Sequence, residues 1–252
     1  MTGRTVLKWS KVYIDGYDLT GYSRTFGPLS WTLAEDDSTV LNDPVKNAIA
    51  GQPMANVGTI NAVLDNTTGA SHDRLSSAGT RVITLPIGFR TNPVAGDPAF
   101  CGEYMQKEHM GVVSNGVAVT ISAAFSGYAN DAVVKTYGNP WGVVIAPKAT
   151  KTAANTATGI DDRGASSSLG GYAVFHLFSS DGAVTLSVQD ADTNSNGSFA
   201  DLVSSGSIDA SSTPVGVAVA LANDATVEQY LRWQLDLGGS STATFAIAFV
   251  RA

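Results

Sequence analysis

The chain has 252 residues, 26 of them glycine, with only 15% charged residues and a formal net charge of −7. A negative protein gains nothing from counterion release on DNA or an anionic membrane, which argues against a conventional binder of either. The single cysteine, Cys101, excludes an internal disulfide framework and is expected to be buried and inert, and no apolar run approaches the roughly 18 residues of a membrane-spanning helix. Short apolar runs between turn residues are typical of an all-β protein.

The first elements are predicted to be strands joined by a tight turn. Asp15-Gly16 breaks the strand expected from Val6 onward, and this pair suits the positive φ angles of a tight hairpin turn. A second strand is expected to end at Trp31 to Leu33.

The following segment, AEDDSTVLNDPVKNAIAGQP, has no strand alternation. Asp43 can cap a helix, Pro44 suits its first position and Gly51 can end it, so we expect one or two helical turns inside a long acidic loop. Long structured loops of this kind are usually functional.

Strands resume at residues 57–64 and 81–89, with a second short helix predicted at 71–79 between them, from the cap Ser71 to Gly79. Two further strands are joined through Asn115-Gly116, the strongest short hairpin signal. Residues 1–145 are therefore predicted to form one β domain, a barrel or sandwich with one or two short helices.

Residues 146–168 are small, polar and without period, and predict a linker. Beyond it, residues 169–252 are predicted to form an antiparallel β-sandwich. Tyr172 to Phe178 is apolar at both alternations, so both faces of that strand are expected to be covered. In TVEQYLRWQLDL, Leu231, Trp233 and Leu235 share one face.

The sequence offers little for catalysis. His72, His109 and His176 stand in no metal-binding or triad spacing, and no phosphate-binding glycine loop or nucleophile motif is present. His176 is interpreted as a packed or rim residue and His109 as a solvated one. We therefore expect no enzyme, no catalytic residue and no cofactor.

One metal site is conceivable, in QDADTNSNGSFAD. Asp190, Asp192 and Asn194 alternate as calcium-loop ligands do, and Asp201 stands where a closing carboxylate belongs. Ser195 replaces the required glycine, however, and no helices flank the segment. The alternative interpretation is a polar hairpin.

Glu35, Asp36 and Asp37 allow three interpretations. They could be a catalytic acid–base pair, simply solvated, or a negative coat on a surface past which an anionic polymer moves.

The order of these elements resembles the major tail tube proteins of long-tailed bacteriophages. The resemblance rests on DGYDLTGYS, the tryptophan strand before VKNAIAGQ, VGTINAVLDN with SHDRLSSAG, RVITLPIGF, and a last strand pair preceded by Gly96-Asp97 and ended by Gly127. It extends from about residue 10 to residue 130.

The resemblance implies a virion protein, assembled in the host cytoplasm, whose copies form rings, typically of six, that stack into a tube. Sheets of neighbouring copies would join round a channel that DNA traverses without specific binding. Residues 33–56 would be the stacking loop, so that the candidate residues for ring stacking or for lining the lumen are Glu35, Asp36, Asp37, Asp43 and Lys46. The C-terminal sandwich would decorate the outside and could touch host-surface glycans weakly.

Two alternatives stay open. The chain could be another phage particle component, such as a capsid decoration or baseplate protein. It could also be a carbohydrate-binding β-sandwich module, an interpretation motivated by Trp141, Trp233 and several tyrosines.

Overall fold

The computed structural model describes residues 7–40, 42, 44–89, 91–113, 117–128, 132, 137–156, 158–162 and 164–252. It confirms an all-β fold. The elements are η1 (Leu7–Trp9), β1 (Tyr13–Ile14), β2 (Tyr17–Asp18), β3 (Ser23–Gly27), β4 (Ser30–Asp37), β5 (Ala48–Asn56), β6 (Gly58–Val63), α1 (Ser71–Leu75), β7 (Gly79–Pro86), β8 (Pro98–Val112), β9 (Thr120–Tyr128), β10 (Trp141–Lys151), β11 (Asn155–Thr156), β12 (Ile160–Asp161), β13 (Gly171–Ser180), β14 (Ala183–Ala191), β15 (Ala200–Asp209), β16 (Val215–Ala220), β17 (Tyr230–Asp236) and β18 (Ala243–Arg251).

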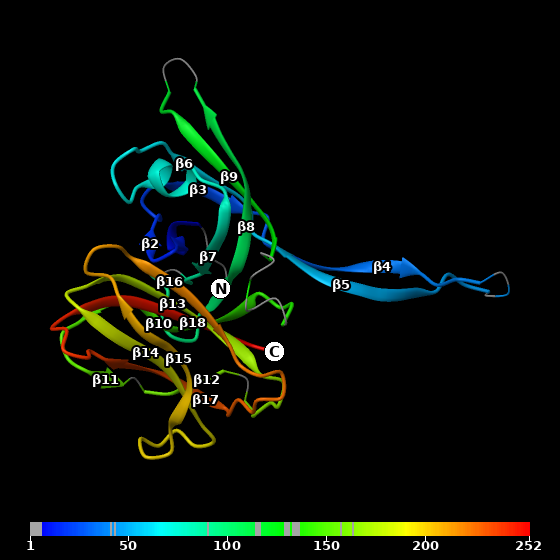
Figure 1. Ribbon diagram of the computed structural model, residues 1–252. Coiled ribbons are helices and arrows are strands. Elements are labelled where there is room, and N and C mark those ends of the chain that lie inside the picture. The colour runs from blue at the N-terminus through cyan, green and yellow to red at the C-terminus, as the bar shows by residue number, and fades with distance from the viewer. Residues whose placement is uncertain are drawn as a thin grey trace.

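One 11-stranded antiparallel sheet runs through most of the chain, in the order β16-β13-β18-β10-β8-β7-β1-β2, and β9, β6 and β3 extend it from β8. Strand β8 connects the two halves. Its first residues pair with β10, as in Phe100 with Trp141, whereas its last residues, from Tyr104 on, pair with β9. The N-terminal and C-terminal halves therefore share a sheet (Figure 1).

The N-terminal half curls round its own apolar core, which includes Ile14, Ile60, Leu85 and Phe125, all buried. The predicted helix is confirmed but shorter, because α1 ends at Leu75 and supplies that side chain to the core. Its N-cap residue is Ala70, not the predicted Ser71.

The C-terminal half is a sandwich, as predicted. A 5-stranded sheet of β11, β12, β17, β14 and β15 faces β16, β13, β18 and β10 across a second apolar core. Leu231, Trp233 and Leu235 point into that core, and the Trp233 ring lies edge-on to Phe245 with 5.3 Å between ring centroids. The alternation in the sequence placed these side chains correctly.

Strand β13 is covered on both faces, also as predicted. Phe175 packs in the sandwich core, whereas Tyr172 and Val174 pack on the other side in a third cluster with Val82 and Cys101 of the N-terminal half. Cys101 is fully buried, and burial raises the pKa of its thiol.

The predicted linker at residues 146–168 is wrong for much of its length. Residues 146–151 continue β10, which pairs with β18, and β11 and β12 both pair with β17. The apolar alternation of a core strand is absent here because no β10 side chain beyond Ala146 is buried. Small residues such as Ala149 and Thr150 complete the ladder without adding to the core.

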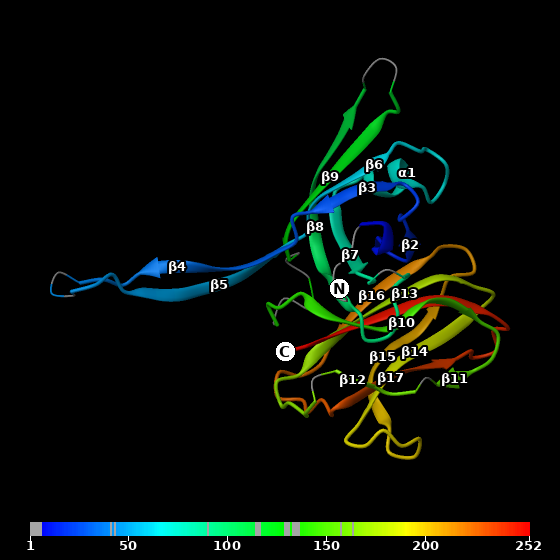
Figure 2. The same ribbon diagram turned by 180° about the vertical axis from the view of Figure 1, so that it is seen from behind.

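The helical turns predicted around residues 43–51 are also wrong. Ala48–Asn56 forms strand β5, which pairs with β4 over nearly its whole length, from Ser30 opposite Asn56 to Asp37 opposite Ala48. Backbone hydrogen bonds to β4 outweigh the capping pattern of the isolated segment. Figures 1 and 2 show this hairpin leaving the body as a long arm, and β8 with β9 projecting separately.

Candidate assembly interface

The arm is a long element that, apart from its base, does not pack against the body of the protein. We define it as residues 30–56, comprising β4, β5 and their connection. It forms a two-stranded sheet of its own, and only its base is anchored, through the fully buried Ala55. A two-stranded ribbon is marginally stable in water without a packing partner.

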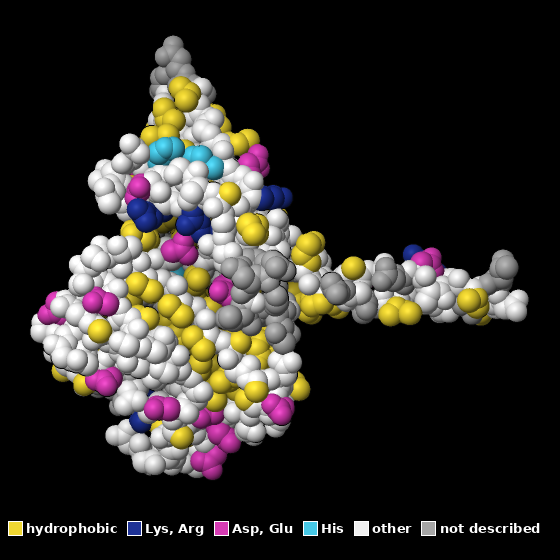
Figure 3. Space-filling model, in the orientation of Figure 1, with side chains coloured by type: hydrophobic (Ala, Val, Ile, Leu, Met, Phe, Trp, Pro, Cys, Tyr) yellow, Lys and Arg dark blue, Asp and Glu magenta, His cyan; other side chains and the backbone are white. Residues whose placement is uncertain are grey.

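Large apolar side chains line the arm and lie open to solvent (Figure 3). Six of them are between 45% and 66% exposed: Trp31, Leu33, Val40, Val45, Ile49 and Met54. Single exposed apolar side chains are normal on a soluble protein, but six large ones on one two-stranded ribbon are more than such scatter. The arm therefore has the composition of a docking element.

The predicted acidic residues lie along the same arm. Glu35 and Asp36 are in β4, opposite Ala50 and Ile49, and Asp37 closes the strand. Lys46 Nζ lies 3.9 Å from Asp37 Oδ2, with both side chains well exposed, so this ion pair adds little stability. Asp43 lies outside the described residues.

Hydrogen bonds fix the outer part of the arm. Asp37 accepts a hydrogen bond from the Thr39 backbone N–H at 2.9 Å. Hydrogen bonding to the side chain and backbone of Thr39 lowers the pKa of Asp37. Thr39 Oγ1 in turn accepts from the Asn47 N–H at 2.9 Å. Asp37 is thus a negative, structured residue on the arm, and it has no catalytic partner among the described residues.

The β8–β9 hairpin is a second projecting surface. Met110, Val112, Val113 and Val117 are exposed along it. The ladder between β8 and β7 ends at Gln106, so the β7-facing edge of the following β8 residues has no strand partner in the described part of the chain. An open edge beside exposed apolar side chains is a template for pairing with another strand.

The two surface histidines meet at the base of this hairpin. His72 of α1 and His109 of β8 have ring centroids 5.2 Å apart, and the Nδ1 of each is buried without a hydrogen-bond partner among the described residues. Burial and the neighbouring His72 lower the pKa of His109. The prediction that His109 is simply solvated missed this contact, since His72 is distant in sequence.

The proposed calcium ligands have other partners. Asp190 Oδ2 accepts from the Glu228 N–H at 2.8 Å, Asp201 accepts from Gln189 at 2.7 Å, and the Asn194 amide donates to the Gly159 carbonyl at 3.1 Å. Asp192 is exposed. Within the described ranges no group of three His, Cys, Asp or Glu could hold a metal.

The two halves of the chain meet at a tight buried junction, which the sequence did not reveal. The predicted hairpin turn is confirmed, with φ of 50° at Asp15 and 83° at Gly16. The Gly16 N–H donates to His176 Nδ1 at 3.1 Å, and His176 Nε2 lies 2.9 Å from Thr84 Oγ1. Burial lowers the pKa of His176 to about 3, so the ring is neutral.

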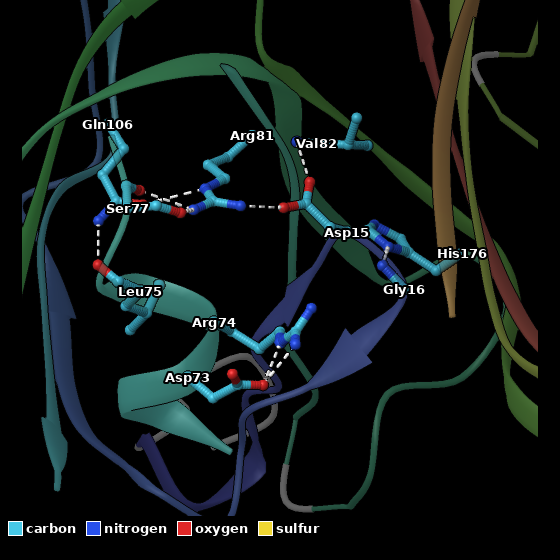
Figure 4. A network of polar contacts seen from close by, with 10 residues as sticks. All are labelled: Asp15, Gly16, Asp73, Arg74, Leu75, Ser77, Arg81, Val82, Gln106 and His176. Atoms are coloured by element: carbon cyan, nitrogen blue, oxygen red, sulfur yellow. Dashed lines mark hydrogen bonds and ion pairs between the residues drawn. The ribbon is translucent and has the colours of Figure 1, made fainter. Parts of the chain in front are cut away.

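Arg81 holds the same turn from the other side (Figure 4). Its Nη1 donates to Asp15 Oδ2 at 2.9 Å, and Asp15 Oδ1 accepts from the Val82 N–H at 2.8 Å. Burial raises the pKa of Asp15 despite these bonds. The turn is thus fixed from β7 and from β13 at once.

Known proteins give little guidance. No model of a protein family and no curated protein matches the chain. Among solved structures, the chain is similar to the SPP1 Dit (gp 19.1) protein, described as a paradigm of the hub adsorption apparatus in phages infecting Gram-positive bacteria. The similarity covers 96% of this chain and 99% of that chain, with 13% identity and a TM-score of 0.34.

No helix in the described part of the chain is long and apolar enough to cross a membrane.

Proposed function

We propose that this chain is a structural protein of a phage virion, whose copies assemble into stacked rings that form a tail tube for the passage of DNA. The observation that carries the proposal is the arm. It exposes six large apolar side chains on a ribbon that the rest of the chain leaves uncovered. In the assembly, a second copy of the chain packs on these apolar side chains.

Sheet edges support the same conclusion. The sheet ends at β3, and β8 has an open edge beyond Gln106 in the described part of the chain. Pairing between copies removes such edges, and closure into a ring removes them all. The order of elements from about residue 10 to residue 130, which resembles tail tube proteins, is consistent with this arrangement.

The negative charge of the chain supports a channel that DNA passes without being bound. The chain carries a net charge of −7, and Glu35 and Asp37 are exposed on the arm. Negative groups repel the phosphate backbone, so a tube built from such subunits lets DNA slide.

Negative-stain electron microscopy of the purified protein tests the proposal. We expect rings or filaments for the wild type, and single particles for a variant in which Val40, Val45 and Ile49 are all replaced by aspartate. Leu169→Asp is the matched control, because Leu169 is also 61% exposed but lies in the C-terminal half.

The alternatives predict different images. Rings that never stack would indicate a baseplate or decoration protein. A wild type that stays monomeric at every concentration and binds immobilised glycans would overturn the tube in favour of a carbohydrate-binding module.

A further inference from the structure

The two ends of the main path of the sheet approach each other at the Gly16–His176 junction, and a cavity of about 200 Å³ lies beside it. Strands β1, β2 and β7 line one side, and β10, β13 and β18 line the other. On the β10–β18 side three alanines line the space and fill little volume, beside larger residues of the same strands; the alanines are Ala146, Ala246 and Ala248. Concave, mostly apolar pockets with a few polar groups are common ligand sites.

The floor of the cavity presents a hydroxyl donor. Because His176 Nδ1 accepts from the Gly16 N–H, the hydrogen of the neutral ring is on Nε2, which donates to Thr84 Oγ1. The Thr84 hydroxyl hydrogen is then free to donate. Thr84 is almost fully buried and lines the cavity, and the described residues offer that hydrogen no acceptor.

A second donor lies beside it. Tyr13 also lines the cavity, and burial, followed by the charge on Asp18, raises the pKa of its hydroxyl. Tyr13 therefore keeps its proton at neutral pH.

The rim is positive in a protein that is negative overall. Lys148 Nζ is bound to Asp18 Oδ2 at 2.7 Å, so those charges cancel. Lys11 lines the cavity too, and no carboxylate among the described residues pairs with it. One uncompensated ammonium group thus faces the same space as the two hydroxyl donors.

We propose that this cavity binds a small organic acid, with the carboxylate held by Lys11, Thr84 and Tyr13 and a compact apolar body against the alanine wall. The Asp18 carboxylate also lines the cavity, but Lys148 neutralises it, so the unpaired charge of Lys11 favours an anion over a cation. The volume is below the roughly 300–1,000 Å³ of sites for drug-sized ligands, so the ligand is a single small ring or short chain.

Titration calorimetry with benzoate, and with benzamide as its uncharged isostere, tests the proposal on the full chain. We expect saturable binding of benzoate, at least tenfold weaker binding of benzamide, and a benzoate affinity that falls as salt rises. Equal binding of both probes, or saturable binding of neither, overturns it.

Variants assign the contacts. Lys11→Met should weaken benzoate at least tenfold, whereas Lys46→Met, on the arm, should leave it unchanged. Thr84→Val should weaken benzoate by about tenfold, and Thr84→Ser, which keeps the hydroxyl, should restore it. Thermal melts confirm that each variant is folded. Wild-type affinity in folded Lys11→Met would show that benzoate binds elsewhere and would overturn the site.

Discussion

The arm and the Gly16–His176 junction differ in whether the rest of the chain covers them. Both are β-hairpins that reach out from the N-terminal half, but the turn at Asp15-Gly16 ends against β16 and β13 of the same chain, whereas the arm ends in solvent. One hairpin is covered within the chain, and under the proposed function the other is covered by a second copy. Substitutions in the first should therefore change stability, and substitutions in the second should change association.

The largest loss of stability is expected for Gly16→Ala. A Cβ at Gly16 would lie 2.4 Å from the Val215 nitrogen, and φ there is +83°. Backbone clash and strain together should cost roughly 3 kcal/mol or more, measured by urea unfolding. Gly21→Ala is the control, since a Cβ there meets nothing within 4 Å. Equal urea midpoints for the two variants would show that the backbone at the junction shifts to accommodate the Cβ at little cost.

A smaller loss is expected for His176→Leu. The variant leaves the buried Gly16 N–H without its acceptor, and Thr84 loses its partner. Unsatisfied buried groups of this kind cost about 1–3 kcal/mol each, so we expect a loss of roughly 2–4 kcal/mol by the same measurement. His109→Leu, on the projecting hairpin, should change stability by about 0.5 kcal/mol or less.

The junction should also make stability depend on pH. The pKa of His176 is lowered from 6.5 to about 3 in the folded chain, so between these values the unfolded chain binds one more proton. Stability should therefore be fully present above pH 6.5 and fall below it, by about 1.4 kcal/mol per pH unit at most from this group. Unfolding from pH 7 to pH 5 should show a shallower slope for His176→Leu. Identical slopes would mean that His176 takes up its proton over the same pH range in the folded and the unfolded chain.

The smallest effect on stability is expected in the arm. Leu33→Ser with Met54→Ser changes exposed side chains, so the free energy of unfolding of the dispersed monomer should move by about 0.5 kcal/mol or less. Assembly followed by light scattering should nevertheless be lost. A variant that assembles normally would show that this part of the arm is not an interface.

Local patterns predicted local structure well. Asp15-Gly16 predicted its turn correctly because the required φ angles depend on those two residues alone. Alternation in β17 identified its buried face because one side of the strand meets a continuous core.

Features that depend on distant partners were missed. His176 lies 160 residues from Gly16, and only the path of the sheet brings them together. The arm was predicted to be a helical loop because Asp43, Pro44 and Gly51 suit a helix locally, and strand β5 nevertheless includes Pro53. Both strands of an isolated ribbon are edges, where proline is tolerated.

The shared strand β8 also has a mechanical consequence. One end of this 15-residue strand lies in the projecting hairpin and the other is paired with β10. Antiparallel hydrogen bonds run perpendicular to the strand, so a pull on the hairpin loads the flanking ladders in shear, all at once. Tension applied at one end of the molecule would thus be carried into the C-terminal half without crossing a flexible tether.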